Sequence, residues 1–220
     1  MEGIIFDCDG VLADSEKVSC ASWLPVLKRR GFAATIADIE PFIGKSDAAL
    51  IDSFRQRGVR DLDDNAMLER EKEYFTLARG SLKGFPGQLA CLEALKRAHI
   101  PIAVASSGRH EKIAFTLGQL GLADQFDAIC SSTEVANGKP APDVFLLAAR
   151  RLAVEPAGCW VIEDSVAGLR GAREAGMTAV GFTSTYDASL LLQAGANWVF
   201  THYDDLRRRV ELARDETGGR

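Results

Sequence analysis

Two aspartates near the start of the chain, Asp7 and Asp9, have the spacing of a cooperating carboxylate pair. An aspartate can form an acyl phosphate when a phosphoryl group is held in line and its charge is neutralised, so Asp7 is the predicted nucleophile. Asp9 could protonate the leaving alkoxide and then, as a base, activate the water that hydrolyses the intermediate. Gly10 would let the backbone approach the phosphoryl group closely. By itself, an Asp-x-Asp pair is more often a solvated turn.

A second segment and a lysine supply side chains that could bind the phosphoryl group. Ser106 would hydrogen-bond its oxygens and Lys139 would offset their charge, where negative charge spreads in the transition state. Ser107 and Arg109 follow Ser106 and could help to position a substrate. Each feature alone has a plainer interpretation, because a strand-end serine is usually a helix cap and Lys-Pro is usually a surface turn.

Glu163 and Asp164 add two further carboxylates. Together with Asp7 they would form a hard, oxygen-rich site, which favours Mg²⁺ over zinc or copper, so Mg²⁺ is the predicted cofactor. Asp9 must be protonated part of the time to act as an acid, whereas Asp7 must be ionised to attack. A bound cation would hold Asp7 ionised and so supply this difference.

Short apolar runs are the elements that must position these residues. They occupy 4–6, 102–105 and 160–162, with weaker runs at 179–182 and 198–200. Helical stretches at 88–98, 110–120, 143–153 and 165–175 lie between them. This alternation predicts an α/β fold with a doubly wound, Rossmann-like parallel sheet. Ligands of such sheets bind outside the carboxyl ends of the strands, where the polar residues fall.

The region from 15 to 82 breaks this alternation. Helical spacing occurs in 17–30, 46–57 and 65–79, and no convincing strand run is present. We therefore predict an inserted all-helical cap domain over 15–82 and a Rossmann-like catalytic core formed by 1–14 and 83–220. Glycines and a proline cluster at 80–87, where the chain returns to the sheet, and could serve as a hinge.

The fuller string Asp-Cys-Asp-Gly-Val-Leu-Ala-Asp-Ser at 7–15 resembles the first motif of the haloacid dehalogenase superfamily, in its phosphatase and β-phosphoglucomutase-like branch. The segments at Ser106, Lys139 and Glu163 follow in the order of that family, so the resemblance spans residues 4 to about 182. It implies an Mg²⁺-dependent phosphatase that hydrolyses a small phosphomonoester, such as a sugar phosphate, through an aspartyl-phosphate intermediate. It also implies that the backbone carbonyl of Asp9 is a metal ligand.

Gly44 and Lys45 stand in a segment that is similar to the end of a phosphate-binding P-loop. Ile39 occupies the position of that motif's first glycine, and the segment does not follow a strand, so we reject the P-loop interpretation. In the resembled family this part of the cap faces the substrate. The resemblance therefore makes Gly44 and Lys45 candidates for substrate specificity.

β-Phosphoglucomutase is the main alternative within the family. Its cap holds a second phosphate with a histidine, an arginine and a lysine, and these positions fall near Ser19, Asp47 and Thr76 here. Losing all three would leave a bisphosphate unsupported, which favours hydrolysis over mutase activity. Dehalogenases of the superfamily do not need the second aspartate, so Asp9 argues against dehalogenation.

The sequence disfavours two other classes of protein. A receiver-type signalling domain also combines a phospho-accepting aspartate with Mg²⁺, a hydroxyl residue and a lysine. It places an acidic pair before a separate acceptor and lacks a large insert after the first strand, so the Asp-x-Asp pair and the insert favour the enzyme. An inactive relative that only binds a ligand is disfavoured because the predicted site residues are intact.

Composition bears on partners and location. The net charge is -5 and the dense basic run at 207–209 has acidic neighbours, so nucleic acid is not a predicted partner. No apolar segment approaches a bilayer span, and no membrane partner is predicted. Five scattered cysteines show no zinc-site pattern and fit reduced thiols in a cytoplasm. The predicted partner is a small phosphorylated metabolite.

Overall fold

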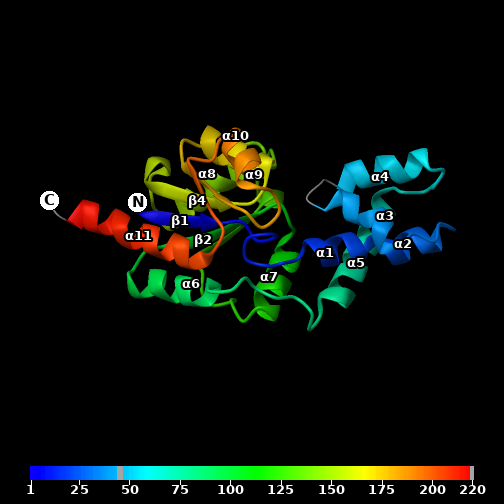
Figure 1. Cartoon of the computed structure of the whole chain (residues 1–220), viewed down its shortest axis with the longest axis horizontal. Helices are drawn as coiled ribbons and strands as arrows, with labels where there is room; N and C mark the ends of the chain where they lie inside the picture. Colours follow the sequence, from blue (N-terminus) through cyan, green and yellow to red (C-terminus); the bar gives the residue numbers. More distant parts are fainter. Residues whose placement is uncertain (44–46, 219–220) are drawn as a thin grey trace. The chain divides into compact units, whose positions relative to one another are not determined.

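A computed structural model describes residues 1–43 and 47–218 of the chain. Its centre is a parallel sheet of six strands in the order β3-β2-β1-β4-β5-β6 (Figure 1). The strands are β1 (Gly3–Phe6), β2 (Ile102–Ser106), β3 (Ala128–Ser131), β4 (Cys159–Glu163), β5 (Thr178–Phe182) and β6 (Trp198–Phe200). The order reverses at β1, which lies between β2 and β4, and this is the crevice where doubly wound sheets bind ligands.

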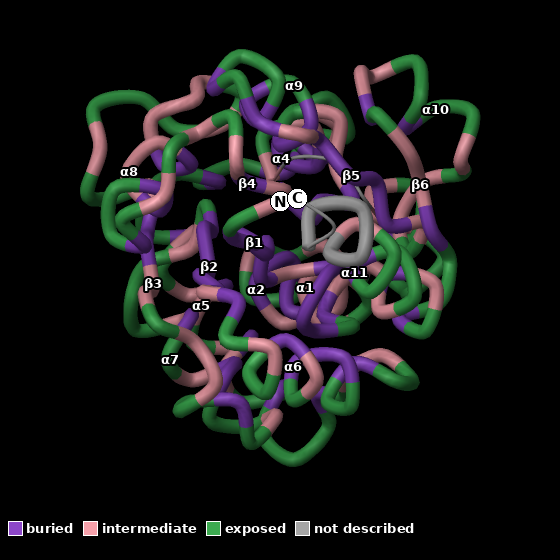
Figure 2. Tube along the Cα trace, turned by 90° about the vertical axis from the view of Figure 1, so that its left-hand side faces the viewer, coloured by how far each residue is buried: buried purple, intermediate pink, exposed green. Residues whose placement is uncertain are grey.

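Helices cover both faces of this sheet, with α8, α9 and α10 on one side and α6 and α7 on the other (Figure 1). Alternation along β1 explains the two layers, because Ile4 and Phe6 pack with one set of helices and Ile5 with the other. The helices are α6 (Gln88–Arg97), α7 (His110–Gln119), α8 (Asp143–Leu152), α9 (Val166–Glu174), α10 (Ala188–Gln193) and α11 (Tyr203–Gly218), with short 3₁₀ turns η2 (Ser132–Glu134) and η3 (Pro156–Gly158). Figure 2 shows the central strands buried between these layers.

The predicted fold class is confirmed, and the five predicted strand runs all form strands. Sequence analysis missed β3, a short edge strand that pairs with β2 from Ala103↔Ala128 to Ser106↔Ser131. Its residues Ala-Ile-Cys-Ser include a single β-branched residue and no aromatic residue, so their β-propensity is low. The four predicted core helices are present within a few residues of their expected ends.

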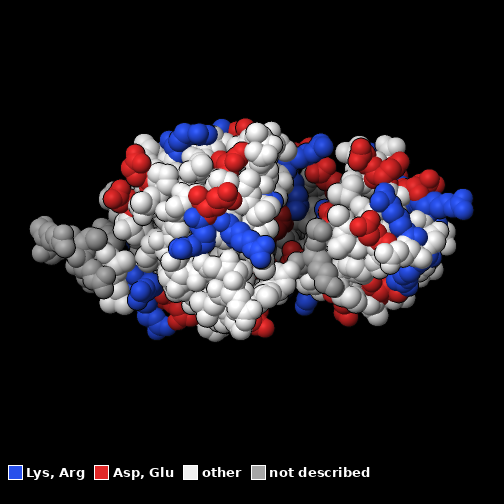
Figure 3. All heavy atoms as spheres, turned by 90° about the horizontal axis from the view of Figure 1, so that it is seen from above, with Lys and Arg blue, Asp and Glu red and all other residues white. Residues whose placement is uncertain are grey.

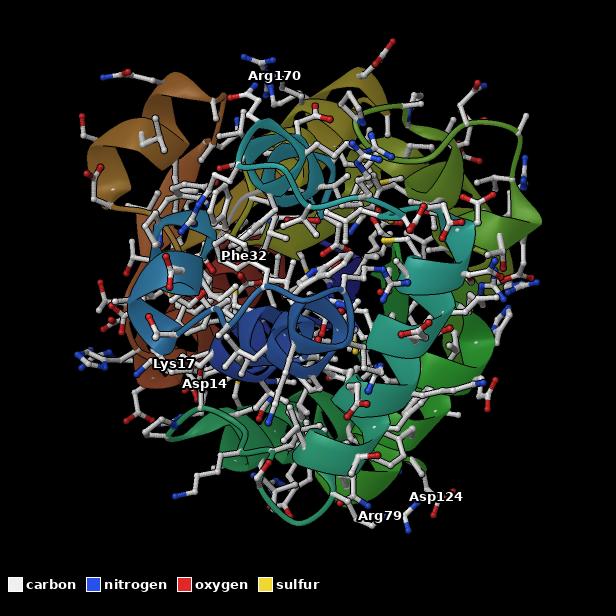
Figure 4. All side chains as sticks on the ribbon, turned by 90° about the vertical axis from the view of Figure 1, so that its right-hand side faces the viewer. Asp14, Lys17, Phe32, Arg79, Asp124 and Arg170 are labelled. Atoms are coloured by element: carbon white, nitrogen blue, oxygen red, sulfur yellow. The ribbon has the colours of Figure 1, made fainter. Side chains whose placement is uncertain are left out.

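Residues Ser15–Leu82 form a second compact unit, separate from the unit built of Met1–Asp14 and Lys83–Arg220. Its helices are α1 (Glu16–Ala21), α2 (Trp23–Arg29), α3 (Ile36–Ile39), α4 (Asp47–Gln56) and α5 (Asp64–Ala78), with a 3₁₀ turn η1 (Glu40–Phe42). The described part of this unit contains no strand. It has its own core, in which Phe32, labelled in Figure 4, packs edge-to-face on Phe54 with ring centroids 5.3 Å apart.

One predicted helix of this smaller unit is divided in the structure. The span 17–30 forms α1 and α2, which meet at Ser22. Pro25 lies in the first turn of α2, where a missing backbone N–H is tolerated, whereas a continuous helix would lose a hydrogen bond there.

Charged side chains of both signs are interspersed on the face of the larger unit in Figure 3. The terminal basic run at 207–209 lies in α11, where Arg207 pairs with Glu211 and Arg208 with Asp205. These pairs agree with the prediction of a solvated helix face. Within the described residues, every helix is too short or too polar to cross a membrane.

Candidate active site

A tight turn carries the chain out of β1 and holds Asp7 and Asp9. The backbone N–H of Asp7 donates to Ile162 of the neighbouring strand at 3.0 Å, and the N–H groups of Leu12 and Ala13 both donate to the carbonyl of Cys8. Two buried side chains brace the turn from outside. Gln88 donates to the carbonyl of Leu12 and the Tyr203 hydroxyl to that of Val11, each at 2.8 Å. The position of the two aspartates is therefore fixed by the core.

Asp7, Glu163 and Asp164 form an acidic cluster, in which one carboxylate oxygen from each residue lies within 4.8 Å of the other two. The parallel register explains the convergence, because Phe6 pairs with Ile162 and the next residues of both strands leave at the same edge. All three side chains are buried. The predicted ligand side chains thus come together.

Lys139 reaches this acidic cluster from the segment before α8. Its ammonium lies 2.6 Å from Asp7 Oδ1, 2.6 Å from Glu163 Oε1 and 2.9 Å from the carbonyl of Ala105. Burial disfavours the charged amine, but the carboxylates of Asp7 and Glu163 outweigh it and raise the pKa of Lys139. Lys139 therefore stays a cation at the centre of the site.

The charges of the site leave room for a further cation. Burial raises the pKa of the Asp7 carboxyl to about 7, and the ammonium of Lys139 opposes that rise. Asp9 and the acidic cluster together contribute four carboxylates, against the two ammonium groups of Lys139 and Lys112. A divalent ion would balance this excess, and an all-oxygen donor set suits Mg²⁺.

Asp9 does not join the acidic cluster through its side chain but pairs with Lys112 on α7. The ammonium lies 2.6 Å from Asp9 Oδ2, and both side chains are largely shielded from solvent. Sequence analysis missed Lys112. The available signal was its place in the first turn of the helix that follows Ser106, because that turn starts at the same edge of the sheet as Asp9.

Ser106 ends β2, next to β1, and is buried. Its hydroxyl oxygen accepts a hydrogen bond from the Gly108 N–H at 3.0 Å, and the Gly108 carbonyl accepts one from Ser131 at 2.7 Å. The loop after β2 is thereby tied to β3. Ser107 and Arg109 are exposed at this loop, and their role in positioning substrate stays a prediction.

Gly10 is required by geometry at the turn after Asp9. Its φ of +75° is a left-handed conformation that favours glycine, and a Cβ there would lie 2.0 Å from Asp164 Oδ2. The carboxylate of Asp164 thus packs directly on the backbone of the turn. Gly168 plays a similar part on α9, since a Cβ at this position would meet the Glu163 carboxylate at 1.9 Å.

Three hydroxyl side chains without a role predicted from the sequence contact the site, two of them at acidic residues and one at the turn after β1. Ser165 caps α9 and donates to Glu163 Oε2 at 2.8 Å. In the loop after β5, Thr185 hydrogen-bonds Asp164 Oδ2, and Ser184 donates to the Gly10 carbonyl at 2.5 Å. Serine and threonine are common in loops, so only the tertiary contacts single these residues out.

Gly44 and Lys45 lie outside the described residues, so their predicted part in specificity stays a prediction. The three positions compared with β-phosphoglucomutase are engaged within the smaller unit. Ser19 hydrogen-bonds Arg70, Asp47 accepts from the indole N–H of Trp23 at 2.8 Å, and Thr76 donates to its own helix.

Comparison with known proteins agrees with this geometry. Residues 1–176 match the haloacid dehalogenase-like hydrolase family. The chain is 33% identical over 180 residues to fructose-1-phosphate phosphatase YqaB of Escherichia coli, covering 81% of this chain and 94% of that protein. It is 34% identical over 204 residues to the Arabidopsis thaliana protein SUPPRESSOR OF QUENCHING 1, covering 90% of this chain but spanning 19% of that longer protein.

The fold also has a close counterpart among solved structures. β-Phosphoglucomutase from Clostridium difficile superposes with a TM-score of 0.78 at 26% identity, and the match covers 100% of both chains. The structural match covers both units of this chain. The family match covers the elements from β1 to α9. The chain therefore belongs to the haloacid dehalogenase-like hydrolase family, as an enzyme of its phosphatase and β-phosphoglucomutase-like branch.

Proposed function

We propose that this phosphatase hydrolyses a small phosphomonoester, of the sugar phosphate class, with Mg²⁺ and through an aspartyl-phosphate on Asp7. One observation carries the proposal. Asp7 is buried at the end of β1 with the Lys139 ammonium 2.6 Å away and with two further carboxylates within 4.8 Å. A nucleophilic carboxylate, a fixed positive charge and a cation site thus occupy one small volume.

In the first step an Asp7 carboxylate oxygen attacks phosphorus and the bond from phosphorus to the leaving oxygen breaks. The leaving alkoxide takes a proton from the Asp9 carboxyl group, which ends the step as a carboxylate. Ser106 and Lys139 bind the phosphoryl oxygens while charge spreads over them. Lys112, 2.6 Å from Asp9, holds that side chain in place for the transfer.

In the second step the Asp9 carboxylate accepts a proton from water as the water oxygen attacks phosphorus. The acyl phosphate bond breaks, the Asp7 carboxylate is restored and inorganic phosphate leaves, so Asp9 ends protonated as it began. The acidic cluster and the Asp9 backbone carbonyl would hold Mg²⁺, which when bound offsets phosphoryl charge and keeps Asp7 ionised.

The proposed substrate class rests on a relative and on the division of the chain into two units. The Escherichia coli relative is a fructose-1-phosphate phosphatase, and the similarity covers 81% of this chain. Phosphoryl chemistry lies in the larger unit, so the unit Ser15–Leu82 is the proposed reader of the organic half of the substrate. The solved β-phosphoglucomutase supports mutase activity as the second candidate.

A panel of phosphorylated sugars and other small metabolites, assayed with Mg²⁺ for released phosphate, tests the proposal. A β-phosphoglucomutase assay run alongside separates hydrolysis from isomerisation. We expect phosphate release from a sugar phosphate, and we expect Asp7→Asn to abolish it while the circular dichroism spectrum is unchanged. Full activity of Asp7→Asn would end the nucleophile assignment, and isomerisation without phosphate release would make the chain a mutase.

A further inference from the structure

The loop at 183–187, which joins β5 to α10, reaches the acidic cluster although no family motif in the sequence analysis includes it. β5 is the neighbour of β4, with Glu163 paired to Gly181, so the loop leaves the sheet at the edge where Asp164 lies. Two consecutive hydroxyl residues of this loop contact two different parts of the site. Ser184 donates to the Gly10 carbonyl at 2.5 Å, and Thr185 hydrogen-bonds Asp164 Oδ2.

The contact with Asp164 restrains a buried carboxylate on two sides. One side is the backbone of Gly10, where even a Cβ would lie 2.0 Å from Asp164 Oδ2. The other is the Thr185 hydroxyl on that same oxygen. Asp164 is 5% exposed, so its orientation depends on these protein contacts rather than on solvent. Thr185 therefore helps to decide which way the carboxylate faces.

Ser184 links the same loop to the turn that carries the aspartates. The Gly10 carbonyl follows Asp9 directly, and the Gly10 N–H donates to Ala13 within the turn. The two hydroxyls together tie the segment after β5 to the segments after β1 and β4. A ligand to a metal is oriented by such outer hydrogen bonds, and their loss typically lowers metal affinity by about 10- to 100-fold.

We propose that Thr185 is a positioning residue for Mg²⁺ binding, which orients Asp164, and that Ser184 holds the loop where Thr185 can do so. The inference rests on the proposed Mg²⁺ site of this phosphatase. It goes beyond that site because the loop at 183–187, which supplies no predicted metal ligand, is proposed to orient the ligand Asp164. The competing explanation is that the two hydroxyls merely anchor the loop and leave the metal site unaffected.

Thr183 supplies a matched control within the same loop. Its hydroxyl donates to the Phe200 carbonyl at 3.3 Å and contacts the Thr201 hydroxyl at 2.9 Å, so it bonds with β6 and the residue after it. Thr183→Val and Thr185→Val remove the same atoms two residues apart. A general loosening of the loop would affect both variants, whereas a role in orienting Asp164 concerns Thr185.

The test is the affinity of the full-length protein for Mg²⁺, measured by isothermal titration calorimetry without substrate. We expect Thr185→Val to weaken binding by about 10- to 100-fold and Thr185→Ser, which keeps the hydroxyl, to restore it to within about threefold. Thr183→Val should bind as the wild type does. Ser184→Ala should weaken binding less than Thr185→Val, and the double variant should bind no more weakly than Thr185→Val alone, because the two act in sequence.

The possible results separate the inference from the function on which it rests. Wild-type affinity in Thr185→Val, or equal losses in Thr183→Val and Thr185→Val, would overturn the role of Thr185. A wild-type protein that binds no Mg²⁺ would instead remove the metal from the proposed function. If Thr185→Val fails to fold by circular dichroism, Thr185→Ala takes its place and Thr185→Ser still decides whether the hydroxyl is needed.

Discussion

At the scale of single residues, the ion pair between Asp9 and Lys112 gives Asp9 a different environment from that of Asp7. Asp7 lies in the acidic cluster with Lys139, whereas the side chain of Asp9 faces Lys112 at 2.6 Å. Two carboxylates separated by one residue thus have different partners from different elements. A carboxylate nucleophile and a carboxyl group that acts as acid and base need different environments, because they must hold different protonation states at the same pH.

We predict that Lys112→Met impairs both steps that use Asp9 while Lys112→Arg retains most activity. Alkyl phosphates, whose leaving alkoxide needs a proton, should lose about 100-fold in kcat, which is the lower end of what a general acid–base group typically contributes. With p-nitrophenyl phosphate, whose leaving group needs no proton, the first step should persist and the second should slow. Stopped-flow measurement should then show a burst of p-nitrophenolate.

A lysine with a purely structural role would give a different kinetic result. If Lys112 only stabilised α7, Lys112→Met would lower the rates for both kinds of substrate equally, with no burst. That result would remove the link between Lys112 and Asp9 that the 2.6 Å contact indicates.

The turn after β1 is the element in which backbone conformation and side-chain packing meet. Gly10 and Gly31 have nearly the same φ, +75° and +77°, but a Cβ at Gly31 would meet no atom within 4 Å. Gly31→Ala therefore measures the conformational cost alone, about 1 kcal/mol of unfolding free energy. Gly10→Ala adds the collision with Asp164.

We predict that Gly10→Ala loses more stability than Gly31→Ala and also loses phosphatase activity by at least about 100-fold, because a misplaced reacting group has that cost. Urea unfolding measures the first quantity and steady-state kinetics the second. Equal stability losses with full activity in Gly10→Ala would show that the turn can move away from Asp164.

An ion pair between Arg151 and Glu134 connects α8 to η2, the 3₁₀ turn after β3. Arg151 hydrogen-bonds Glu134 and, together with the Ser131 N–H and His110, lowers the pKa of that carboxyl from 4.5 to about 2. A lowered folded-state pKa stabilises the fold above the ordinary value of 4.5 and ceases to do so as the pH falls through about 2. Because these groups are partly exposed, screening limits the gain to about 0.5–1 kcal/mol.

We predict that Arg151→Gln is less stable than the wild type at pH 7 and that this difference shrinks as the pH falls from 4.5 towards 2. Arg150→Gln is the control, since Arg150 is exposed on the same helix and forms no ion pair among the described residues. Thermal unfolding over this pH range measures the effect. A difference that stayed constant with pH would assign the loss to the Arg151 contact with the Ile129 carbonyl instead.

At the scale of the whole molecule, Mg²⁺ bound at the acidic cluster would add to the stability of the larger unit. The carboxylates of the cluster lie at the ends of β1 and β4, and a hydrogen bond from the loop after β5 holds that of Asp164. An ion bound there stabilises the folded state by about 2.7 kcal/mol when its concentration is a hundred times its Kd. We predict that EDTA lowers the midpoint of thermal unfolding and abolishes turnover, and that Mg²⁺ restores both.

Asp164→Asn is the control for this prediction, because it should fold but should gain little stability from Mg²⁺. A wild-type protein whose unfolding midpoint and turnover were unchanged by EDTA would exclude the metal from the mechanism. Comparing the gain in unfolding midpoint with Mg²⁺ between the wild type and Asp164→Asn would also show whether Mg²⁺ acts at the acidic cluster or elsewhere on the fold.

The sequence alone determined the family, the fold class and most of the elements of this protein. The Asp-x-Asp pair, Ser106 and Glu163-Asp164 follow or end apolar runs that are visible in the sequence, and Lys139 precedes a predicted helix, so fold class and family could be predicted. Such signals are local in the chain, because strand burial and helix periodicity repeat over a few residues.

Only the tertiary structure decided which partners surround those residues. Ser184 and Thr185 have no local signal, because each acts on a residue at least 21 positions away in the chain. Lys112 has a signal in its place in the first turn of α7, but its partner Asp9 lies 103 positions away. The edge strand β3 was also missed, since its stability comes from pairing with β2 rather than from its own composition. Hydrogen bonds between loops depend on the sheet order that brings them together, and neither composition nor period encodes that order.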